Sequence, residues 1–280
     1  MDYLELTIDL EPRNPWAEIL IAELSDMGFD SFVETETGIQ AYAPATIGDV
    51  SQILNETSLG SHDDIEVRWH SVIIPHQNWN AVWEASFDPV VVGERLAILA
   101  PFHDKSLFKE HQIIVIQPQM SFGTGHHQTT FLMSEYLLDL VPFPKRVLDM
   151  GTGTGVLAIL AEQLGAEEVL AVDIEPWSVE NTIENASRNG CKNVKALEGD
   201  IEAIQAGNFG LILANINKNV LKKHMESYAK LIVNHGLLYL SGFFTSDVKE
   251  LEEIAKLHGF HLLETREKET WASMKLIKSN

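Results

Sequence analysis

Three glycines at alternate positions are the residues of this chain whose types and spacing best suit chemistry. Gly151, Gly153 and Gly155 lie between an apolar segment that predicts a buried strand and a segment that predicts a helix. Glycine allows a tight turn and lets a ligand reach the main chain beside a helix N-terminus. The next predicted strand ends in Asp173, whose carboxylate can accept hydrogen bonds from two ribose hydroxyls. Together these features predict a nucleoside-type ligand at the carboxyl edge of a parallel sheet.

The spacing of the glycines distinguishes two classes of nucleoside ligand. In the dinucleotide fingerprint the third glycine would fall at position 156, which is a valine here, and Gly155 precedes it. Asp149 adds a carboxylate, which suits a ligand with an ammonium group better than one with a pyrophosphate. This pattern resembles the first motif of Rossmann-like methyltransferases, which bind S-adenosylmethionine. A glycine-rich segment alone could be a flexible turn, but the flanking strand and helix and Asp173 favour the cofactor.

Three further polar residues lie where predicted strands or helices begin or end. Asn215 follows an apolar strand, and its carbonyl could orient a neutral amine by accepting an N–H bond. Thr130 lies in the first turn of a helix that could offer donors to a carboxylate of the cofactor. Asp200 follows another strand, where methyltransferases often carry an acidic residue that reaches the adenine amino group. The alternatives are that Asn215 or Thr129 caps a helix and that Asp200 is a solvated loop carboxylate.

Composition limits the classes of function. The 280 residues, 45% hydrophobic and 22% charged, indicate a soluble globular protein with one large domain or a large and a small one. Forty-one acidic residues against 20 basic ones give a formal charge of −21, which would repel nucleic acid and attract a basic macromolecule. Such acidity can also serve solubility alone.

The same sequence carries no sign of a membrane segment, a signal peptide or a metal site. No apolar run approaches the ~20 residues of a membrane span, and the acidic N-terminus does not fit a signal peptide. The single cysteine, Cys191, fits a reducing cytoplasm. The 11 histidines lack zinc-ligand spacing, so we expect no metal.

Residues 1–74 have the pattern of a small domain of their own. The predicted elements are a strand at 4–10, a helix at about 15–28, a hairpin around 37–38, a helix at about 46–54 and a strand at 65–74. Asn14 and Thr46 are the expected helix caps, with Pro15 at the first helical position. The order βαββαβ is that of a ferredoxin-like α+β domain. By itself this fold predicts only a small binding domain.

A linker and a larger domain follow. Residues 75–92 are expected to be a partly helical linker, because Trp79, Trp83 and Phe87 recur at helical spacing. Residues 93–280 alternate strands and helices, which predicts a doubly wound parallel sheet. Strands are expected at 93–101, 112–117, 147–150, 169–173, 194–197, 211–214 and 237–241, and helices at 129–140, 156–164, 177–189, 219–232 and 246–257. A last pair of strands, 261–267 and 272–277, predicts an antiparallel edge.

These motifs together resemble the PrmA family, which methylates large-subunit ribosomal protein eleven. The residues that carry the resemblance are Phe122–Gly125, His127, Thr129 and Thr130, then Asp149, Gly151, Gly153, Gly155–Ile159, Asp173, Ile174, Pro176 and Ala214–Ile216, and upstream Phe87, Pro89 and Gly93–Leu96. The resemblance covers essentially the whole chain. The sequence departs from the family pattern at His126, Gln128, Thr152 and Asn217–Lys218.

The resemblance implies a Rossmann-like S-adenosylmethionine-dependent methyltransferase domain with a small N-terminal ferredoxin-like domain. It implies cofactor contacts at Thr130, Gly151, Asp173 and Asn215. It also implies trimethylation of lysine side chains and of the N-terminal amine of the ribosomal protein. The small domain would recognise this basic partner, and the protein would act in the cytoplasm as a monomer without direct contact to nucleic acid or membrane.

Hypotheses from other functional classes remain open at this point. An NAD-dependent oxidoreductase would need a glycine in place of Val156. A non-enzymatic ribosome-assembly factor would not need an intact cofactor motif. A methyltransferase could also act on another basic protein or on a free amine.

Overall fold

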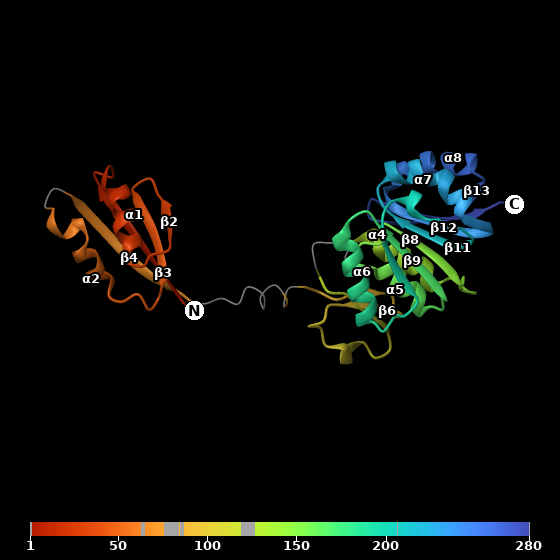
Figure 1. Ribbon diagram of the computed structural model, residues 1–280, viewed down its shortest axis with the longest axis horizontal. Coiled ribbons are helices and arrows are strands. Elements are labelled where there is room, and N and C mark those ends of the chain that lie inside the picture. The colour runs from red at the N-terminus through yellow and green to blue at the C-terminus, as the bar shows by residue number, and fades with distance from the viewer. Residues whose placement is uncertain are drawn as a thin grey trace. The chain divides into compact units, whose positions relative to one another are not determined.

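The computed structural model describes residues 2–62, 65–75, 84, 87–118, 127–205 and 207–279. The chain divides into two compact units, Met1–Ser86 and Phe87–Asn280, which are described separately (Figure 1). Trp79, Trp83 and the loop at 121–126 lie outside the described residues, so the predictions about them stay predictions. No helix in the described ranges is both long and apolar enough to cross a membrane.

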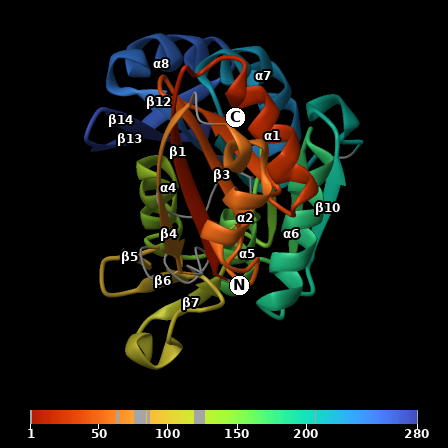
Figure 2. The ribbon, with the colours of Figure 1, turned by 90° about the vertical axis from the view of Figure 1, so that its left-hand side faces the viewer.

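The first unit is a four-stranded antiparallel sheet with the strand order β2-β3-β1-β4. Its elements are β1 (Tyr3–Glu11), α1 (Trp16–Asp26), β2 (Ser31–Glu34), β3 (Gly38–Pro44), α2 (Val50–Glu56) and β4 (Glu66–Ile74). Alternate residues of β1, from Leu4 to Leu10, are buried and contact both helices in one core. Figure 2 shows α1 and α2 on the same side of this sheet. This is the predicted ferredoxin-like arrangement.

The two predicted caps in this unit are wrong. Helix α1 is preceded by Pro15, without a side-chain cap, because the Arg13 carbonyl accepts from the Ala17 amide at 2.9 Å. Helix α2 is capped by Asp49, whose carboxylate accepts from the Ser51 amide at 2.8 Å. Thr46 instead lies within a turn that the Ile47 amide closes on Pro44.

The second unit is built on a seven-stranded sheet with the order β10-β9-β8-β11-β12-β14-β13. These strands are β8 (Arg146–Met150), β9 (Glu168–Asp173), β10 (Val194–Glu198), β11 (Phe209–Asn215), β12 (Ile232–Phe244), β13 (Phe260–Lys268) and β14 (Trp271–Lys278). Neighbours from β10 to β12 are parallel, whereas β14 is antiparallel to both β12 and β13. The last two strands therefore form the predicted antiparallel pair, with β14 inserted between β12 and β13.

Helices cover both faces of this sheet (Figure 1). One core joins the sheet to α4 (Gln128–Leu138), α5 (Val156–Gln163) and α6 (Pro176–Arg188). The other core joins it to α7 (Lys218–Leu231) and α8 (Val248–Leu257). A separate small sheet holds β5 (Val90–Val92), β6 (Leu96–Leu99) and β7 (Gln112–Val115). Strand order reverses beside β8, so a crevice is expected at the carboxyl ends of β8 and β11.

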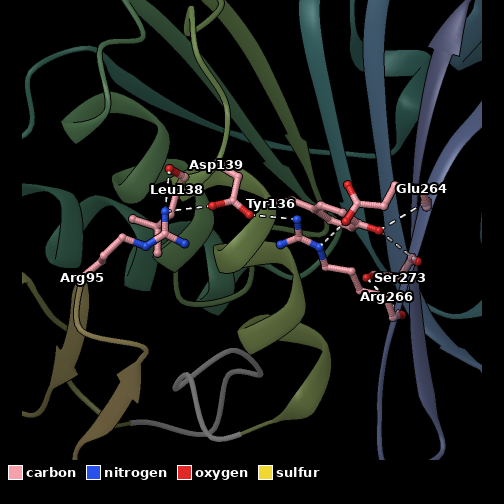
Figure 3. A network of polar contacts seen from close by, with 7 residues as sticks. All are labelled: Arg95, Tyr136, Leu138, Asp139, Glu264, Arg266 and Ser273. Carbon is pink, nitrogen blue, oxygen red and sulfur yellow. Dashed lines mark hydrogen bonds and ion pairs between the residues drawn. The ribbon is translucent and has the colours of Figure 1, made fainter.

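Helix α4 is fixed at its C-terminal end by a polar network (Figure 3). Arg266 of β13 donates hydrogen bonds to Asp139 at 2.8 Å and to Glu264 at 2.7 Å. Its guanidinium lies 4.3 Å from the centre of the Tyr136 ring. Arg95, which follows β5, pairs with the second Asp139 oxygen at 2.8 Å. The network thus holds three separate elements together, and it fixes the helix whose other end carries Thr129 and Thr130.

We predict that Arg266→Met lowers the free energy of unfolding of the second unit by about 1–3 kcal/mol. The variant leaves Asp139 and Glu264 without their shared cation and removes the contact with Tyr136. Lys256→Met, which removes an exposed ion pair on α8, is the control and should leave stability nearly unchanged. Urea unfolding of both variants measures the difference. Equal midpoints would contradict a structural role for the network.

Candidate active site

A cavity of about 490 Å³ lies at the carboxyl edge of the large sheet. Its volume falls within the range of small-molecule sites. The lining residues used below are Gly151 and Gly153 after β8, Asp173 and Ile174 after β9, Asp200 after β10, Asn215 and Ile216 at β11, Val220 and His224 on α7, and His127, Thr129 and Trp271. The structure therefore brings Gly151, Gly153, Asp173, Asp200 and Asn215, all predicted site residues, to one cavity.

The amide groups of the glycine-rich turn already have partners within the protein. The Gly151 amide donates to the Val172 carbonyl at 2.8 Å, and the Gly155 amide donates to Thr152 at 2.9 Å. The Gly153 amide donates to the Asp173 carboxylate at 2.9 Å. Phosphate sites at such turns depend on free amide donors. Because these three donors are occupied, the turn suits a pyrophosphate poorly.

Asp173 ties the turn to the neighbouring strand. One carboxylate oxygen accepts from Gly153, and the other accepts from the Glu175 amide at 3.1 Å. Only 9% of the residue is exposed, but it lines the cavity. Each carboxylate oxygen can accept more than one hydrogen bond, so capacity remains for hydroxyl groups of a ligand.

Gly151 is required by close packing beside the cavity. Its φ of +72° is in the left-handed region, and an added Cβ would lie 2.2 Å from Cγ2 of Ile216. Both residues line the cavity. A side chain at position 151 would therefore strain the backbone and displace Ile216.

Asp149 is buried behind the turn and is not part of the cavity lining. Its carboxylate accepts a hydrogen bond of 2.7 Å from the Thr152 hydroxyl. Burial raises the pKa of Asp149 to about 7, and the negative charge of Asp173 adds to this effect. Near neutral pH the group is poised between its neutral and charged forms.

Asn215 presents an acceptor without a partner. Its amide nitrogen donates to the Thr130 hydroxyl over a long 3.5 Å, and its buried Oδ1 has no hydrogen-bond partner among the described residues. The cap of α7 is Asn217, which accepts from the Val220 amide at 3.2 Å, so the capping alternative does not apply to Asn215. Thr130 is fully buried behind the cavity lining and connects α4 to β11.

Asp200 is held by several groups rather than solvated freely. It accepts from the Ile201 amide at 2.7 Å, while Nζ of Lys223 lies 3.3 Å and Nε2 of His224 lies 3.0 Å from its oxygens. Burial alone would raise the pKa of Asp200, but the hydrogen bond from Ile201 and the proximity of His224 and Lys223 outweigh it and lower that pKa.

Aromatic residues that the sequence did not single out also line the cavity. The ring of Trp271 on β14 lies 4.5 Å from that of His127 and 4.4 Å from that of Phe244, between ring centroids. His127, not Thr129, caps α4. His224 on α7 was also missed. The only signal for His224 in the sequence is its spacing of four residues from Val220.

Across the described part of the chain, no group of three or more His, Cys, Asp or Glu side chains could hold a metal ion.

Comparison with known proteins identifies the family. A family model described as ribosomal protein L11 methyltransferase (PrmA) matches residues 18–279. A relative of that name from Porphyromonas gingivalis is 42% identical over 265 residues, which cover 92% of this chain and 89% of the relative. The chain belongs to the PrmA family. The predicted resemblance is thereby confirmed.

Other matches agree with this placement. A PrmA-family relative from Bacteroides fragilis, named ribosomal protein L11 methyltransferase, is 37% identical over 280 residues, covering 99% of this chain and 100% of the relative. The crystal structure of a ribosomal protein L11 methylase from Lactobacillus delbrueckii subsp. bulgaricus superposes with a TM-score of 0.65 at 29% identity. It covers 69% of this chain and 100% of that chain. The predicted Rossmann-like methyltransferase fold is confirmed.

The raised pKa of Asp149 predicts a specific pH dependence of stability. The folded state retains a proton that the unfolded chain loses at about pH 4, so this residue's contribution to stability falls as pH rises towards 7 and is constant above it. Asp149→Asn removes this dependence and keeps an acceptor for Thr152. The stability of the variant relative to the parent should therefore rise by roughly 3 kcal/mol between pH 5 and pH 8. Urea unfolding across this range tests it, and parallel pH profiles would disprove a raised pKa.

Proposed function

We propose that this protein transfers methyl groups from S-adenosylmethionine to amines of ribosomal protein L11. The observation that carries the proposal is the buried carbonyl oxygen of Asn215, which has no hydrogen-bond partner among the described residues, at a cavity whose glycine amides are already bonded. We further propose lysine side chains and the N-terminal amine as acceptors, each methylated up to three times. The alternative is methylation of another basic protein or of a free amine, and the assay described below distinguishes it from methylation of L11.

The residues around the cavity fit this cofactor. Asp173 would take the two ribose hydroxyls, and Asp200 would take the amino group of the adenine. The turn at Gly151 and Gly153 would lie against the methionine part. Asp149 and Thr130 lie behind the lining, so their roles would be electrostatic attraction of the cofactor ammonium and support of Asn215. The occupied glycine amides and the buried Val156 disfavour the dinucleotide alternative.

The protein's own task is to present a neutral amine in the correct direction. When bound, S-adenosylmethionine supplies an electrophilic methyl group on sulfur. A lysine amine in water has a pKa of ~10.4 and must lose its proton before it attacks. Transfer into a partly apolar cavity disfavours the charged form. In the first two transfers the Asn215 oxygen can then accept one N–H so that the lone pair faces the methyl group, whereas the neutral dimethylamine of a third transfer has no N–H to offer. The proton that the ammonium group loses before each attack goes to solvent, so the rate should rise with pH, and S-adenosylhomocysteine is the leaving group.

We expect purified protein to add methyl groups to ribosomal protein L11 and Asn215→Ala to slow this by about 10²–10³-fold, as loss of an orienting hydrogen bond does. Asn219→Ala, an exposed neighbour of the same type, is the control and should keep full activity. Mass spectrometry of L11 counts the methyl groups. The reaction mixture contains a chelator, because we expect methyl transfer to need no metal ion. Unmodified L11 with the parent enzyme contradicts the proposal, and parental activity of Asn215→Ala contradicts its mechanism.

The first unit is proposed to recognise the substrate. Residues 1–86 carry 16 acidic side chains and only two basic ones, so this unit holds most of the net charge and suits a basic partner. Its edge strand β4 also exposes Trp69, Val72 and Ile73. The described residues that line the cavity all fall between His127 and Trp271 in the second unit. The cytoplasm, where ribosomal proteins are made, is the compartment that this proposal requires.

A fragment of residues 87–280 should bind the cofactor with an affinity within about threefold of the full chain. It should lose methylation of L11 by roughly a hundredfold or more, because the acidic unit is missing. In the full chain, the KM for L11 should rise as salt is increased from low to physiological concentration. Calorimetry and the mass-spectrometric assay measure both effects. A fragment that methylates L11 at the full rate would show that the first unit does not recognise the substrate.

A further inference from the structure

A buried histidine beside Asp200 has no role in the function described so far. His224 lies on α7 with 2% of its side chain exposed, and it lines the cavity. Val220, one helical turn earlier, also lines the cavity, and Tyr228, one turn later, is fully buried. Residues at a spacing of four share one face of a helix. His224 therefore belongs to the face that α7 turns towards the cavity and the end of β10.

The imidazole is close to a carboxylate but lacks well-directed hydrogen bonds. Its Nε2 lies 3.0 Å from Oδ1 of Asp200, yet neither ring nitrogen has a partner of hydrogen-bond geometry among the described residues. A buried polar group without such a partner destabilises the fold by an amount comparable to a lost hydrogen bond. A polar side chain that is almost fully buried and lines a cavity points to a role in binding.

The two oxygens of Asp200 have unequal surroundings. Oδ1 accepts from the Ile201 amide and faces His224, whereas Oδ2 meets the largely exposed Lys223. His224 thus acts on the oxygen that is already bound to the backbone and helps to fix the orientation of the carboxylate. Ile174 and Val220, which line the same cavity, offer apolar side chains to a flat base. This arrangement suits a purine with an exocyclic amino group.

We propose that His224 is a positioning residue that orients Asp200, so that the carboxylate selects the 6-amino group of adenine in the cofactor. The inference rests on the proposed use of S-adenosylmethionine. Adenine presents a donor at position 6, whereas hypoxanthine presents a carbonyl oxygen. A carboxylate can accept only from a donor, so a fixed Asp200 opposes the oxygen of hypoxanthine.

The test compares S-adenosylhomocysteine with S-inosylhomocysteine by calorimetry, using the full-length protein. The parent should bind the adenine compound about 100-fold more tightly. His224→Leu should reduce this ratio to about tenfold, because Asp200 loses one of its restraints. His224→Gln, which restores an N–H donor, should recover most of the ratio. Tyr228→Phe is the matched control and should keep the parental ratio, since it keeps the ring that contacts His224 and removes only a buried hydroxyl that has no hydrogen-bond partner in the described part of the chain.

A second comparison asks whether His224 acts through Asp200. Asp200→Asn alone should reduce the ratio to near one, because its amide can donate to the oxygen of hypoxanthine as well as accept from the amino group of adenine, and adding His224→Leu should cause no further loss. A parental ratio in His224→Leu, or an additive loss in the double variant, would overturn the inference. A parent that binds S-adenosylhomocysteine without base discrimination would overturn it as well. A parent that binds neither compound would instead disprove the proposed function.

Discussion

The hydrogen bond between the Gly153 amide and the Asp173 carboxylate is the contact on which the site depends. It joins the turn after β8 to the end of β9, the neighbouring strand in the sheet. The second Asp173 oxygen holds the Glu175 amide, at the start of α6. One side chain therefore sets the shape of the turn and the position of the next helix. Because these contacts lie within the protein, they preorganise the turn for binding.

The same bond decides which ligands the site can hold. A turn with free amides attracts phosphate, but here the three glycine amides are bonded internally, and the carboxylates of Asp149 and Asp173 accept hydrogen bonds from the turn at Thr152 and Gly153. Negative groups at this place favour a ligand with positive charge. The raised pKa of Asp149 reflects the cost of burying it without such a partner. The acidity of the whole chain acts over a longer range and favours a basic macromolecular substrate.

Much of this arrangement could be predicted from sequence because it depends on local patterns. Apolar runs that end in Asp149, Asp173 and Asn215 determine three parallel strands, and strands of one sheet end at one edge. The positions of the glycine motif and of Asn215 at that edge follow directly from these runs. Helix caps were predicted less well: Asn14 and Thr46 have suitable side chains, but a backbone carbonyl and Asp49 satisfy the amides instead.

Other parts of the site depend on contacts between distant segments. Trp271 reaches the cavity only because β14 inserts between β12 and β13, and no short-range pattern encodes that order. His224 shares its helical spacing with ordinary core residues, so its burial beside Asp200 emerges only in three dimensions. Two of the residues at which the sequence differs from the family pattern, Asn217 and Lys218, have structural explanations. Asn217 caps α7, and Lys218 pairs with Asp247 at 2.7 Å.

The bonded turn should favour a methyl-donor nucleoside over a dinucleotide. Titration of the full-length protein with S-adenosylmethionine and, separately, with NAD in a calorimeter tests this claim most directly. We expect saturable binding of S-adenosylmethionine and an affinity for NAD weaker by at least about 100-fold, equivalent to about 2.7 kcal/mol. Equal affinities, or tighter binding of NAD, would contradict it.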